Sequence, residues 1–430
     1  MPRLRRTSLA AAAALVAMVC AVAPAGAAET VPGEVVVART TATAASSHGP
    51  AFRTVRTRDV AATLRRLRAR DDVRYAVRNV KARASAFVPD DGGRGTGWAD
   101  VQWNFAGPFG VQAPQAWEHL IAAGRPGGNG VTVAVLDTGV AYRARGRYLQ
   151  SPDLDPRRFV AGYDFVDDDR YAMDANGHGT HVASTIAETT HNQFGLTGLA
   201  YGARIMPVRV LDDQGEGDAS TIAEGVRFAA RRGAQIINLS LEFSADVRAR
   251  EIPQLLDAIS YAHRRGSIIV AASGNEAGRA VAYPARASSV ISVGSTTEHG
   301  CLSDFSNQGR GLDLVAPGGG PDAFLDEPNC KPEGAPGRNI SQVTLVGRDR
   351  RRFGIADHYQ GTSMAVPHVS AVAALVIASG ILGPKPSPQA VERRLETTAS
   401  DLGPVGRDQR YGAGLLNAAA ATDPKRPVSR

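Results

Sequence analysis

Short apolar segments alternate with helical ones from about residue 100 onward. Five runs dominated by Val, Ile, Leu and Ala predict strands buried on both faces, at residues 131–137, 204–211, 234–241, 267–275 and 289–295. Residues 220–234 and 255–266 predict helices, because each reaches a Gly with Arg in its last turn. This alternation predicts an α/β fold, a three-layer sandwich around a central, mostly parallel sheet.

A smaller pattern occupies residues 30–88. The segment VPGEVVVA predicts a strand, and an Arg-rich segment after it predicts a helix whose apolar face carries Val60, Leu64 and Leu67. We therefore expect a small α+β module before the main domain. A module of this size has a thin core and gains stability by docking on a larger partner.

Two further segments lack a regular period. Residues 89–97, PDDGGRGTG, have the Pro, Asp and Gly content of a flexible linker. Residues 318–358 are rich in Gly, Pro and charge, and they predict a surface insertion.

The first residues have the layout of a secretory signal peptide. Arg3, Arg5 and Arg6 precede an apolar run at residues 9–22, and small alanines follow. A membrane anchor is the alternative, but the run is shorter than the ~20 residues that a spanning helix needs. We expect residues 1–28 to be removed and the protein to be secreted into the extracellular space, with no stable membrane anchor.

Composition and charge are those of a globular protein that does not bind nucleic acid. A hydrophobic content of 43 % is ordinary for a packed globular chain. The formal net charge is +7, but residues 1–90 hold 15 Lys and Arg against 6 Asp and Glu, so the main domain has no basic excess and nucleic-acid binding is not expected. Without Cys20, the exported protein keeps Cys301 and Cys330, which form either a disulfide or two separate buried thiols.

Three stretches place a reactive side chain beside glycines at the edge of a predicted element. Asp137 ends a buried strand in LDTGV, His178 lies in NGHGTHVASTIA, and Ser363 opens a long apolar helix in GTSMAVPHV. A serine hydroxyl needs an imidazole to take its proton, and a carboxylate on the other ring nitrogen fixes the tautomer of that imidazole. The helix N-terminus supplies backbone donors for an oxyanion, and Asn275 in AASGNE offers a side-chain amide as a second donor.

These four stretches resemble the motifs of the subtilisin-like serine proteases, the subtilases or peptidase S8 family. They follow the family's order Asp, His, Asn, Ser, and the resemblance covers about residues 100–420. It implies a serine-type endopeptidase with Asp137, His178 and Ser363 as its triad and Asn275 in its oxyanion hole.

The resemblance also implies a domain organisation. Residues 29–90 correspond to the family's propeptide with its linker, an inhibitor and folding aid, and residues 95–425 to the catalytic domain. We expect a zymogen, active on protein or peptide substrates as a monomer, that is activated by cleavage between residues 81 and 100.

Each motif has a simpler alternative. A lone Asp after a strand is often a turn residue, and a lone Ser before a helix is often an N-cap. His178 and His181, three residues apart, could bind a metal, whereas the resemblance gives His181 a supporting role. His263 and His368 are expected to be surface or structural residues.

Two other functions compete with the peptidase. A catalytically inactive relative that acts as a binding protein would have lost at least one of the four residues, and all four are present. A serine esterase of the α/β-hydrolase kind would carry GxSxG in the order Ser, Asp, His, which this chain does not follow.

The resemblance also predicts a substrate cleft between two segments. Its walls are Ser240, Leu241 and Glu242 on one side, and Ala271, Ala272, Ser273 and Gly274 on the other. Where the family usually has SLGG, this chain has SLEF, so Glu242 and Phe243 replace two glycines. Together with Glu276, Glu242 favours Lys or Arg before the scissile bond, unless it is merely solvated.

No cofactor is expected for catalysis, but the resemblance implies a structural Ca²⁺. The matching ligands are the side chains of Gln102, Asp153 and Asn192 and the carbonyls of Thr190, Phe194 and Leu196. An acidic run predicts either a second, weaker site or solvated loop charge, and comprises Asp164, Asp167, Asp168 and Asp169.

Overall fold

The computed structural model describes residues 30–39, 52–80, 87–323, 327–332, 337–347 and 351–427. The predicted signal peptide, residues 1–28, lies outside them. The chain divides into two compact units, Met1–Ser85 and Ala86–Arg430.

The N-terminal unit is a three-stranded antiparallel sheet with one helix. Its elements are β1 (Thr30–Arg39), β2 (Phe52–Arg56), α1 (Val60–Arg68) and β3 (Val73–Val80), with strand order β2-β1-β3. Asp59 caps α1 by accepting a hydrogen bond from the Ala62 N–H at 2.9 Å. Leu64 and Leu67 pack on Val35 and Val37 to form a small core. The predicted α+β module is therefore confirmed as a separate unit.

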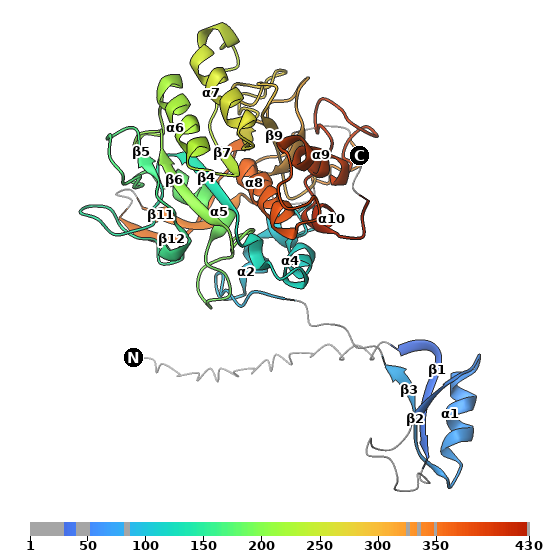
Figure 1. Ribbon diagram of the computed structural model, residues 1–430. Coiled ribbons are helices and arrows are strands. Elements are labelled where there is room, and N and C mark those ends of the chain that lie inside the picture. Colours follow the sequence, from blue (N-terminus) through green and yellow to red (C-terminus); the bar gives the residue numbers. More distant parts are fainter. Residues whose placement is uncertain are drawn as a thin grey trace, which may run out of the picture. The chain divides into compact units, whose positions relative to one another are not determined.

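The larger unit is built on a seven-stranded parallel sheet (Figure 1). In spatial order its strands are β10 (Leu314–Pro317), β9 (Ile291–Thr296), β8 (Ile268–Ala272), β7 (Ile236–Leu239), β4 (Thr132–Asp137), β6 (Arg204–Arg209) and β5 (Tyr163–Asp164). Each of the five predicted strands is present, and the sheet is parallel as expected.

Helices cover both faces of this sheet. They are α2 (Trp98–Val101), α3 (Trp103–Ala106), α4 (Ala113–Ala122), α5 (His178–Ala187), α6 (Ala219–Arg231), α7 (Pro253–Arg264), α8 (Thr362–Ser379), α9 (Pro388–Thr398) and α10 (Ala418–Thr422), with single 3₁₀ turns at Pro126–Gly128, Pro156–Arg158 and Ala249–Glu251. Successive strand residues point to opposite faces: Val133 and Val135 pack with α5 and α8, whereas Ala134 and Leu136 pack with α6 and α7. The three-layer sandwich is confirmed.

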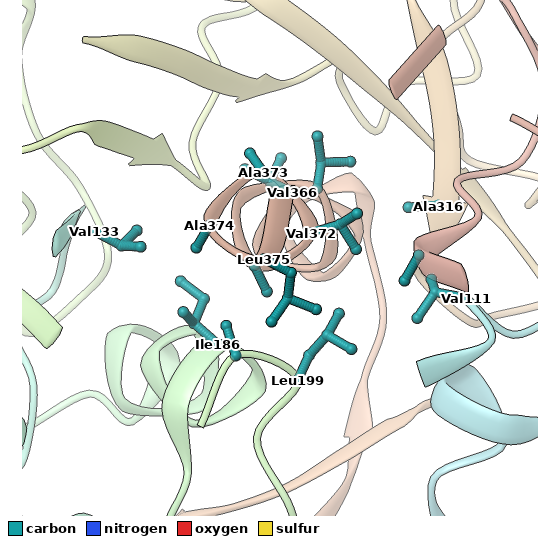
Figure 2. Packing of buried hydrophobic residues seen from close by; sticks show 14 of the residues in the cluster. Val111, Val133, Ile186, Leu199, Ala316, Val366, Val372, Ala373, Ala374 and Leu375 are labelled. Carbon is teal, nitrogen blue, oxygen red and sulfur yellow. The ribbon is translucent and has the colours of Figure 1, made fainter. Parts of the chain in front are cut away.

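Helix α8 runs through the centre of one of the two cores. Figure 2 shows it surrounded by Val133, Ile186, Leu199 and Ala316 from four other segments. By length and composition it is the one helix among the described residues that could cross a membrane, but 78 % of its apolar window is buried inside the unit. Its hydrophobicity therefore serves internal packing.

The predicted surface insertion is partly wrong. Strands β11 (Ile340–Val346) and β12 (Arg352–Tyr359) form an antiparallel pair, and the residues of β11 up to Leu345 are buried. The Ser184 hydroxyl of α5 donates to the Val343 carbonyl at 3.2 Å. The apolar pattern did not predict this strand, because β11 contains polar residues that are nevertheless buried.

The predicted linker is also anchored to the larger unit. Asp91 is 1 % exposed, and its carboxylate accepts hydrogen bonds from the backbone N–H groups of His191 and Asn192 at 3.0 and 3.1 Å. The Gly93 N–H donates to the Gly195 carbonyl at 2.9 Å. Residues 89–97 are thus held as a surface segment of the domain and do not form a free linker.

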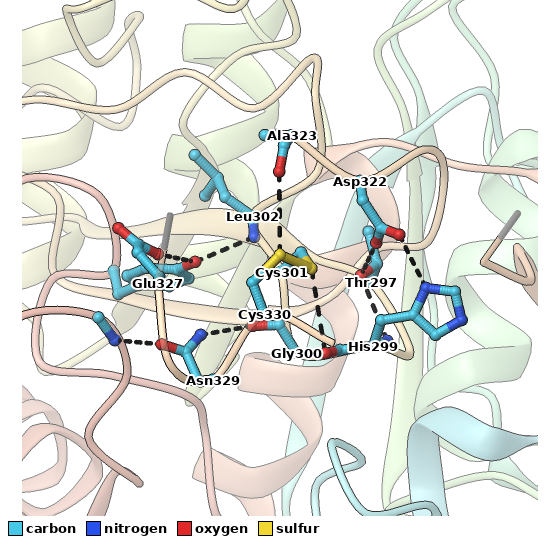
Figure 3. Close-up of a disulfide and its surroundings, with 12 residues drawn as sticks. Thr297, His299, Gly300, Cys301, Leu302, Asp322, Ala323, Glu327, Asn329 and Cys330 are labelled. Atoms are coloured by element: carbon cyan, nitrogen blue, oxygen red, sulfur yellow. Dashed lines mark hydrogen bonds and ion pairs between the residues drawn. A yellow bond between two sulfur atoms is a disulfide. The ribbon is translucent and has the colours of Figure 1, made fainter. Parts of the chain in front are cut away.

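Cys301 and Cys330 form a disulfide (Figure 3), which settles the alternative that the sequence left open. Next to Cys330, Asn329 donates to the Gly300 carbonyl at 2.6 Å and accepts from the Gly403 N–H at 2.8 Å. The cross-link and these hydrogen bonds fasten the loop after β10 to neighbouring segments.

Candidate active site

Strand β4 lies where the direction of the sheet order reverses. The chain passes from β4 through α5 to β6 on one side, and then returns to β7 on the other side of β4. In parallel sheets such a switch point opens a crevice at the carboxyl ends of the strands. Asp137 is the last residue of β4 and lies at this point.

Asp137 and His178 form a close pair. The Nδ1 atom of His178 lies 2.8 Å from Oδ1 of Asp137, which also accepts the Thr138 N–H at 2.7 Å. The Asp137 side chain is fully buried, whereas that of His178 is 24 % exposed. A buried carboxylate therefore orients an imidazole whose other nitrogen remains available for the cleft.

Glycine is required where α5 begins. Gly177 has φ of 103°, in the left-handed region. A Cβ atom at Gly179 would lie 2.1 Å from the Gly139 carbonyl oxygen and 3.0 Å from Asp137 Oδ1. The two glycines that flank His178 in the sequence thus let the helix approach the end of β4.

Asp174 fixes the same turn and was missed by the sequence analysis. Its buried carboxylate accepts the backbone N–H groups of Asn176, Gly177 and Thr180 at 2.8, 2.9 and 3.0 Å. The Thr344 hydroxyl of β11 donates to the Gly177 carbonyl at 2.6 Å. The only sequence signal was an Asp four residues before the His, which is too common to be specific.

The environment of His178 raises the pKa of its imidazole. Burial is the largest influence and lowers the pKa, but the charge and hydrogen bond of Asp137, with the charge of Asp174, outweigh it. The protonated form that a general base adopts after taking a proton is therefore stabilised here.

Ser363 is the second residue of α8, where a helix leaves backbone N–H groups without internal acceptors. Four residues later, Pro367 lacks the N–H that would bind the Ser363 carbonyl. The Ser240 hydroxyl donates to that carbonyl instead, at 2.8 Å. Asn238 in turn donates to Ser240 at 3.0 Å and accepts from Ser370 at 2.8 Å. This buried network ties the end of β7 to the start of α8.

Asn275 follows β8 and is held at both ends of its side-chain amide. Its Oδ1 accepts the Thr362 N–H at 2.8 Å and the Thr362 hydroxyl at 3.1 Å. Its Nδ2 donates to Oε2 of Glu242 at 2.8 Å, and its backbone N–H donates to Oε1 at 3.1 Å. The amide nitrogen is thus directed away from α8, and a carboxylate occupies one of its protons.

Of these residues, His178, Asn275 and Ser363 line one cleft of about 590 Å³. It is lined by Thr138, Asn176, His178, Leu211, Gln214, Gly215, Glu216, Gly217, Ile222, Ser240, Leu241, Glu242, Phe243, Asn275 and Ser363. Ser240, Leu241 and Glu242, which the sequence predicts as one wall, are among these lining residues. Ala271, Ala272, Ser273 and Gly274 are buried at the end of β8 and are absent from the lining, so on that side Asn275 faces the cleft.

The other three histidines considered in the sequence, His181, His263 and His368, have structural partners. His181 bonds to the Ile340 carbonyl at 3.1 Å and stacks on Tyr359, and burial lowers its pKa to about 3. His178 and His181 thus engage different groups, which does not favour a shared metal. His368 is buried, and its Nδ1 bonds to the Met364 carbonyl at 2.9 Å, whereas His263 bonds to a side chain of α9.

Part of the predicted calcium set converges around Asp153. This carboxylate is fully buried and accepts from the Asn192 side chain at 2.8 Å and the Leu196 N–H at 3.1 Å. Gln102 bonds to Thr197, the residue after Leu196, and its Oε1 accepts the Thr197 N–H at 3.0 Å. Phe194 is 49 % exposed, and the Thr190 hydroxyl bonds to the Glu188 carbonyl at 3.1 Å.

The charges near Asp153 nevertheless fit a cation. Burial raises the pKa of Asp153 to about 7, although the hydrogen bonds from Asn192 and Leu196 oppose it. Glu188, which the sequence analysis missed, is also fully buried; burial and the charge of Asp153 raise its pKa well above 4.5. Among the described residues neither carboxylate has a basic partner, so a cation would compensate both. Asn192 presents its amide nitrogen to Asp153, and its amide would have to turn to act as a ligand.

Two carboxylates of the acidic run that begins at the end of β5 are paired with a buried arginine. Arg209 lies 2.9 Å from Asp164 and 2.7 Å from Asp167, and it also pairs with Asp213 at 2.9 Å. Asp168 accepts from the Tyr163 hydroxyl at 2.6 Å. The run therefore forms an ion-pair network, and nothing in its contacts favours a second calcium site.

Comparisons with known proteins agree with this architecture. The subtilase family, peptidase S8, matches residues 128–414. A thermophilic serine proteinase of Bacillus sp. strain AK1 is 33 % identical over 361 residues, 84 % of this chain and 76 % of the relative. Subtilisin Savinase of Lederbergia lenta is 36 % identical over 312 residues, 73 % of this chain and 96 % of the relative.

A solved structure described as proteases from Pseudoalteromonas arctica PAMC 21717 superposes with a TM-score of 0.63 at 29 % identity, and the match covers 78 % of this chain and 99 % of that one. The fold and these matches define a serine endopeptidase that acts on protein substrates. The chain belongs to the subtilase family.

Proposed function

We propose that this chain is a secreted serine endopeptidase, made as a zymogen, in which Ser363 is the nucleophile, His178 its general base and Asp137 the carboxylate that orients the base. The observation that carries the proposal is the 2.8 Å contact between His178 Nδ1 and Asp137, in a cleft that Ser363 also lines.

The reaction is acyl transfer to water. The Ser363 hydroxyl attacks the peptide carbonyl carbon while His178 takes its proton, and the carbonyl oxygen becomes an oxyanion held by the Ser363 N–H and the Asn275 amide. His178 then gives the proton to the leaving amine as the C–N bond breaks. Water, deprotonated by His178, attacks the acyl-enzyme and releases the carboxylic acid product and free Ser363.

An extended substrate would pair with the backbone of Ser240 to Glu242, with Ala271 to Gly274 behind the opposite wall. Pairing through the backbone is largely blind to sequence. This arrangement supports action on many proteins. We further propose that the enzyme acts as a monomer.

The N-terminal unit supports the zymogen proposal. It is compact, ends at Ser85 and has its own small core. We assign residues 29–90 to a propeptide that inhibits the catalytic domain, residues 95–425, until it is cleaved. The disulfide supports export, because such bonds persist in oxidising compartments.

A structural calcium ion belongs to the same proposal. Asp153 and Glu188 supply the buried negative charge, and Gln102, Asn192 and the carbonyls of the 190–196 loop supply further oxygens. The ion would stabilise this loop and take no part in the chemistry. Thermal unfolding with and without Ca²⁺ tests the site: Asp153→Asn should abolish any rise in melting temperature, whereas an equal rise in the variant would exclude Asp153 as a ligand.

Comparison of the wild type with Ser363→Ala tests the enzyme assignment. A serine-directed fluorophosphonate should label only the wild type, and only the wild type should remove its own N-terminal unit. Equal labelling or equal processing in the variant would overturn the assignment of Ser363.

A further inference from the structure

Glu242 accepts one of the two protons of the side-chain amide that the reaction needs. Its two carboxylate oxygens accept the Asn275 backbone N–H and the Asn275 Nδ2 proton, at 3.1 and 2.8 Å. With Oδ1 of the same amide fixed by Thr362, Asn275 cannot exchange its oxygen and nitrogen ends without losing these bonds. The carboxylate therefore stands beside the position where an oxyanion would form.

A carboxylate in this position conflicts with catalysis. Glu242 and the oxyanion would draw on the same amide group, and both are negative, so the ionised side chain would oppose the charge that the amide must stabilise. No basic side chain among the described residues relieves this conflict. Burial raises the pKa of Glu242, and so does the like charge of Glu276. The hydrogen bonds from Asn275 and Thr362 lower it.

The cleft lining also lacks a Lys or Arg, and His178, its one basic residue, is held by Asp137. The lining contains two carboxylates, Glu216 and Glu242. A cation that neutralises Glu242 must therefore come from outside the lining, and a substrate side chain that enters the cleft beside the scissile bond can carry one. Arg and Lys are long enough to bring their charge to a carboxylate while their stems cover the neighbouring Leu241 and Phe243.

We propose that Glu242 is a specificity-determining residue that couples the charge of the substrate to the oxyanion donor. In the free enzyme it accepts the Asn275 amide proton. A basic side chain next to the scissile bond pairs with Glu242, draws the carboxylate off Asn275 and frees that amide for the oxyanion. This inference rests on the proposed function and narrows it to peptides with Arg or Lys beside the cleaved bond.

Two peptides that differ only in arginine or citrulline before the scissile bond test the inference. Citrulline keeps the shape of arginine and removes its charge. The wild type should cleave the arginine peptide with kcat/KM at least about tenfold higher, as expected for a close charge pair. In Glu242→Gln the citrulline peptide should be cleaved faster than in the wild type, and the preference should fall to about one.

Glu216→Gln is the matched control, because it removes the other cleft carboxylate without touching Asn275; it should keep the preference for arginine. Glu242→Gly provides a second variant and should behave as Glu242→Gln does. The inference is overturned if the wild type cleaves both peptides equally. It is also overturned if both Glu242 variants lose activity on both peptides by the same factor, since Glu242 would then be a positioning residue that merely holds Asn275.

Fluorophosphonate labelling separates this inference from the proposed function. If wild-type Ser363 is labelled but the arginine preference is missing, only the role of Glu242 fails. If Ser363 is not labelled and neither peptide is cleaved, the proposed function fails with it.

Discussion

The two sides of Ser363 are prepared to different degrees. On the proton-transfer side, Asp137 and His178 are complementary in charge, lie 2.8 Å apart and are anchored by a turn whose backbone donors are satisfied by Asp174. On the oxyanion side, the Asn275 amide is shared with Glu242. The base is thus organised before substrate arrives, whereas the donor already has one amide proton engaged by a carboxylate.

The largest effect is expected from a substitution in the Asp137–His178 pair. In Asp137→Asn the amide nitrogen can donate toward His178 and favours the wrong tautomer, so kcat should fall by about 10⁴-fold with little change in KM. Steady-state kinetics on a peptide substrate measures this. A loss of less than about tenfold would show that Asp137 does not orient the base.

The oxyanion side should respond less strongly. Asn275→Ala removes one donor and should lower kcat by roughly 10²- to 10³-fold. The double variant with Glu242→Gln sharpens the comparison, because residues in contact show non-additive effects. If the two changes were additive in log kcat, the contact between these residues would have no bearing on the reaction.

A smaller effect is expected when the hydrogen bond from Ser240 to the Ser363 carbonyl is removed. Ser240→Ala leaves the Ser363 carbonyl without a donor and should lower the free energy of unfolding by about 1–3 kcal/mol, measured by denaturant titration. Ser370→Ala is the control, because it removes a hydrogen bond to Asn238 from the same network without touching Ser363. Only Ser240→Ala should also lower kcat; equal kcat values for the two variants would show that the Ser363 carbonyl needs no support.

The pH dependence should be the mildest test. Because the pKa of His178 is raised above 6.5, kcat/KM should rise about tenfold per pH unit below that raised pKa and level off above it. The same shift stabilises the folded state below the unfolded pKa, and this contribution is lost as pH rises through the folded pKa. A profile that bends below pH 6.5 would contradict the influence of Asp137.

Short motifs and apolar runs predicted most of this architecture. The strands β4, β6, β7, β8 and β9 are rich in apolar residues because both of their faces are covered, and the glycines around His178 mark a close approach of backbones. The pairing of Asp137 with His178 was predicted from the need of a serine nucleophile for an imidazole and a carboxylate, and from the resemblance of the motifs to those of the family.

Features that depend on tertiary partners could not be predicted. Strand β11 is buried through polar contacts with α5, and Asp91 is buried because the 191–192 backbone offers it donors. The contact between the Glu242 carboxylate and Asn275 could not be predicted either. The motif SLEF shows that a side chain replaces a glycine, but not the direction in which that side chain points.

The anchoring of Asp91 also bears on where the mature enzyme begins. The expected activation window spans residues 81–100, yet the backbone from Pro89 to Trp98 is already fastened: the Trp98 indole donates to the Pro89 carbonyl at 3.0 Å, and the Trp98 N–H donates to the Asp91 carbonyl at 3.1 Å. A protease requires an extended, detachable stretch, so the cut should fall before Pro89, which leaves Pro89 and Asp90, the last two residues of the assigned propeptide, on the mature enzyme. Edman sequencing of the active enzyme should therefore find a new amino terminus that lies before Asp91. The segment around Asp91 should remain bound to the surface of the mature enzyme.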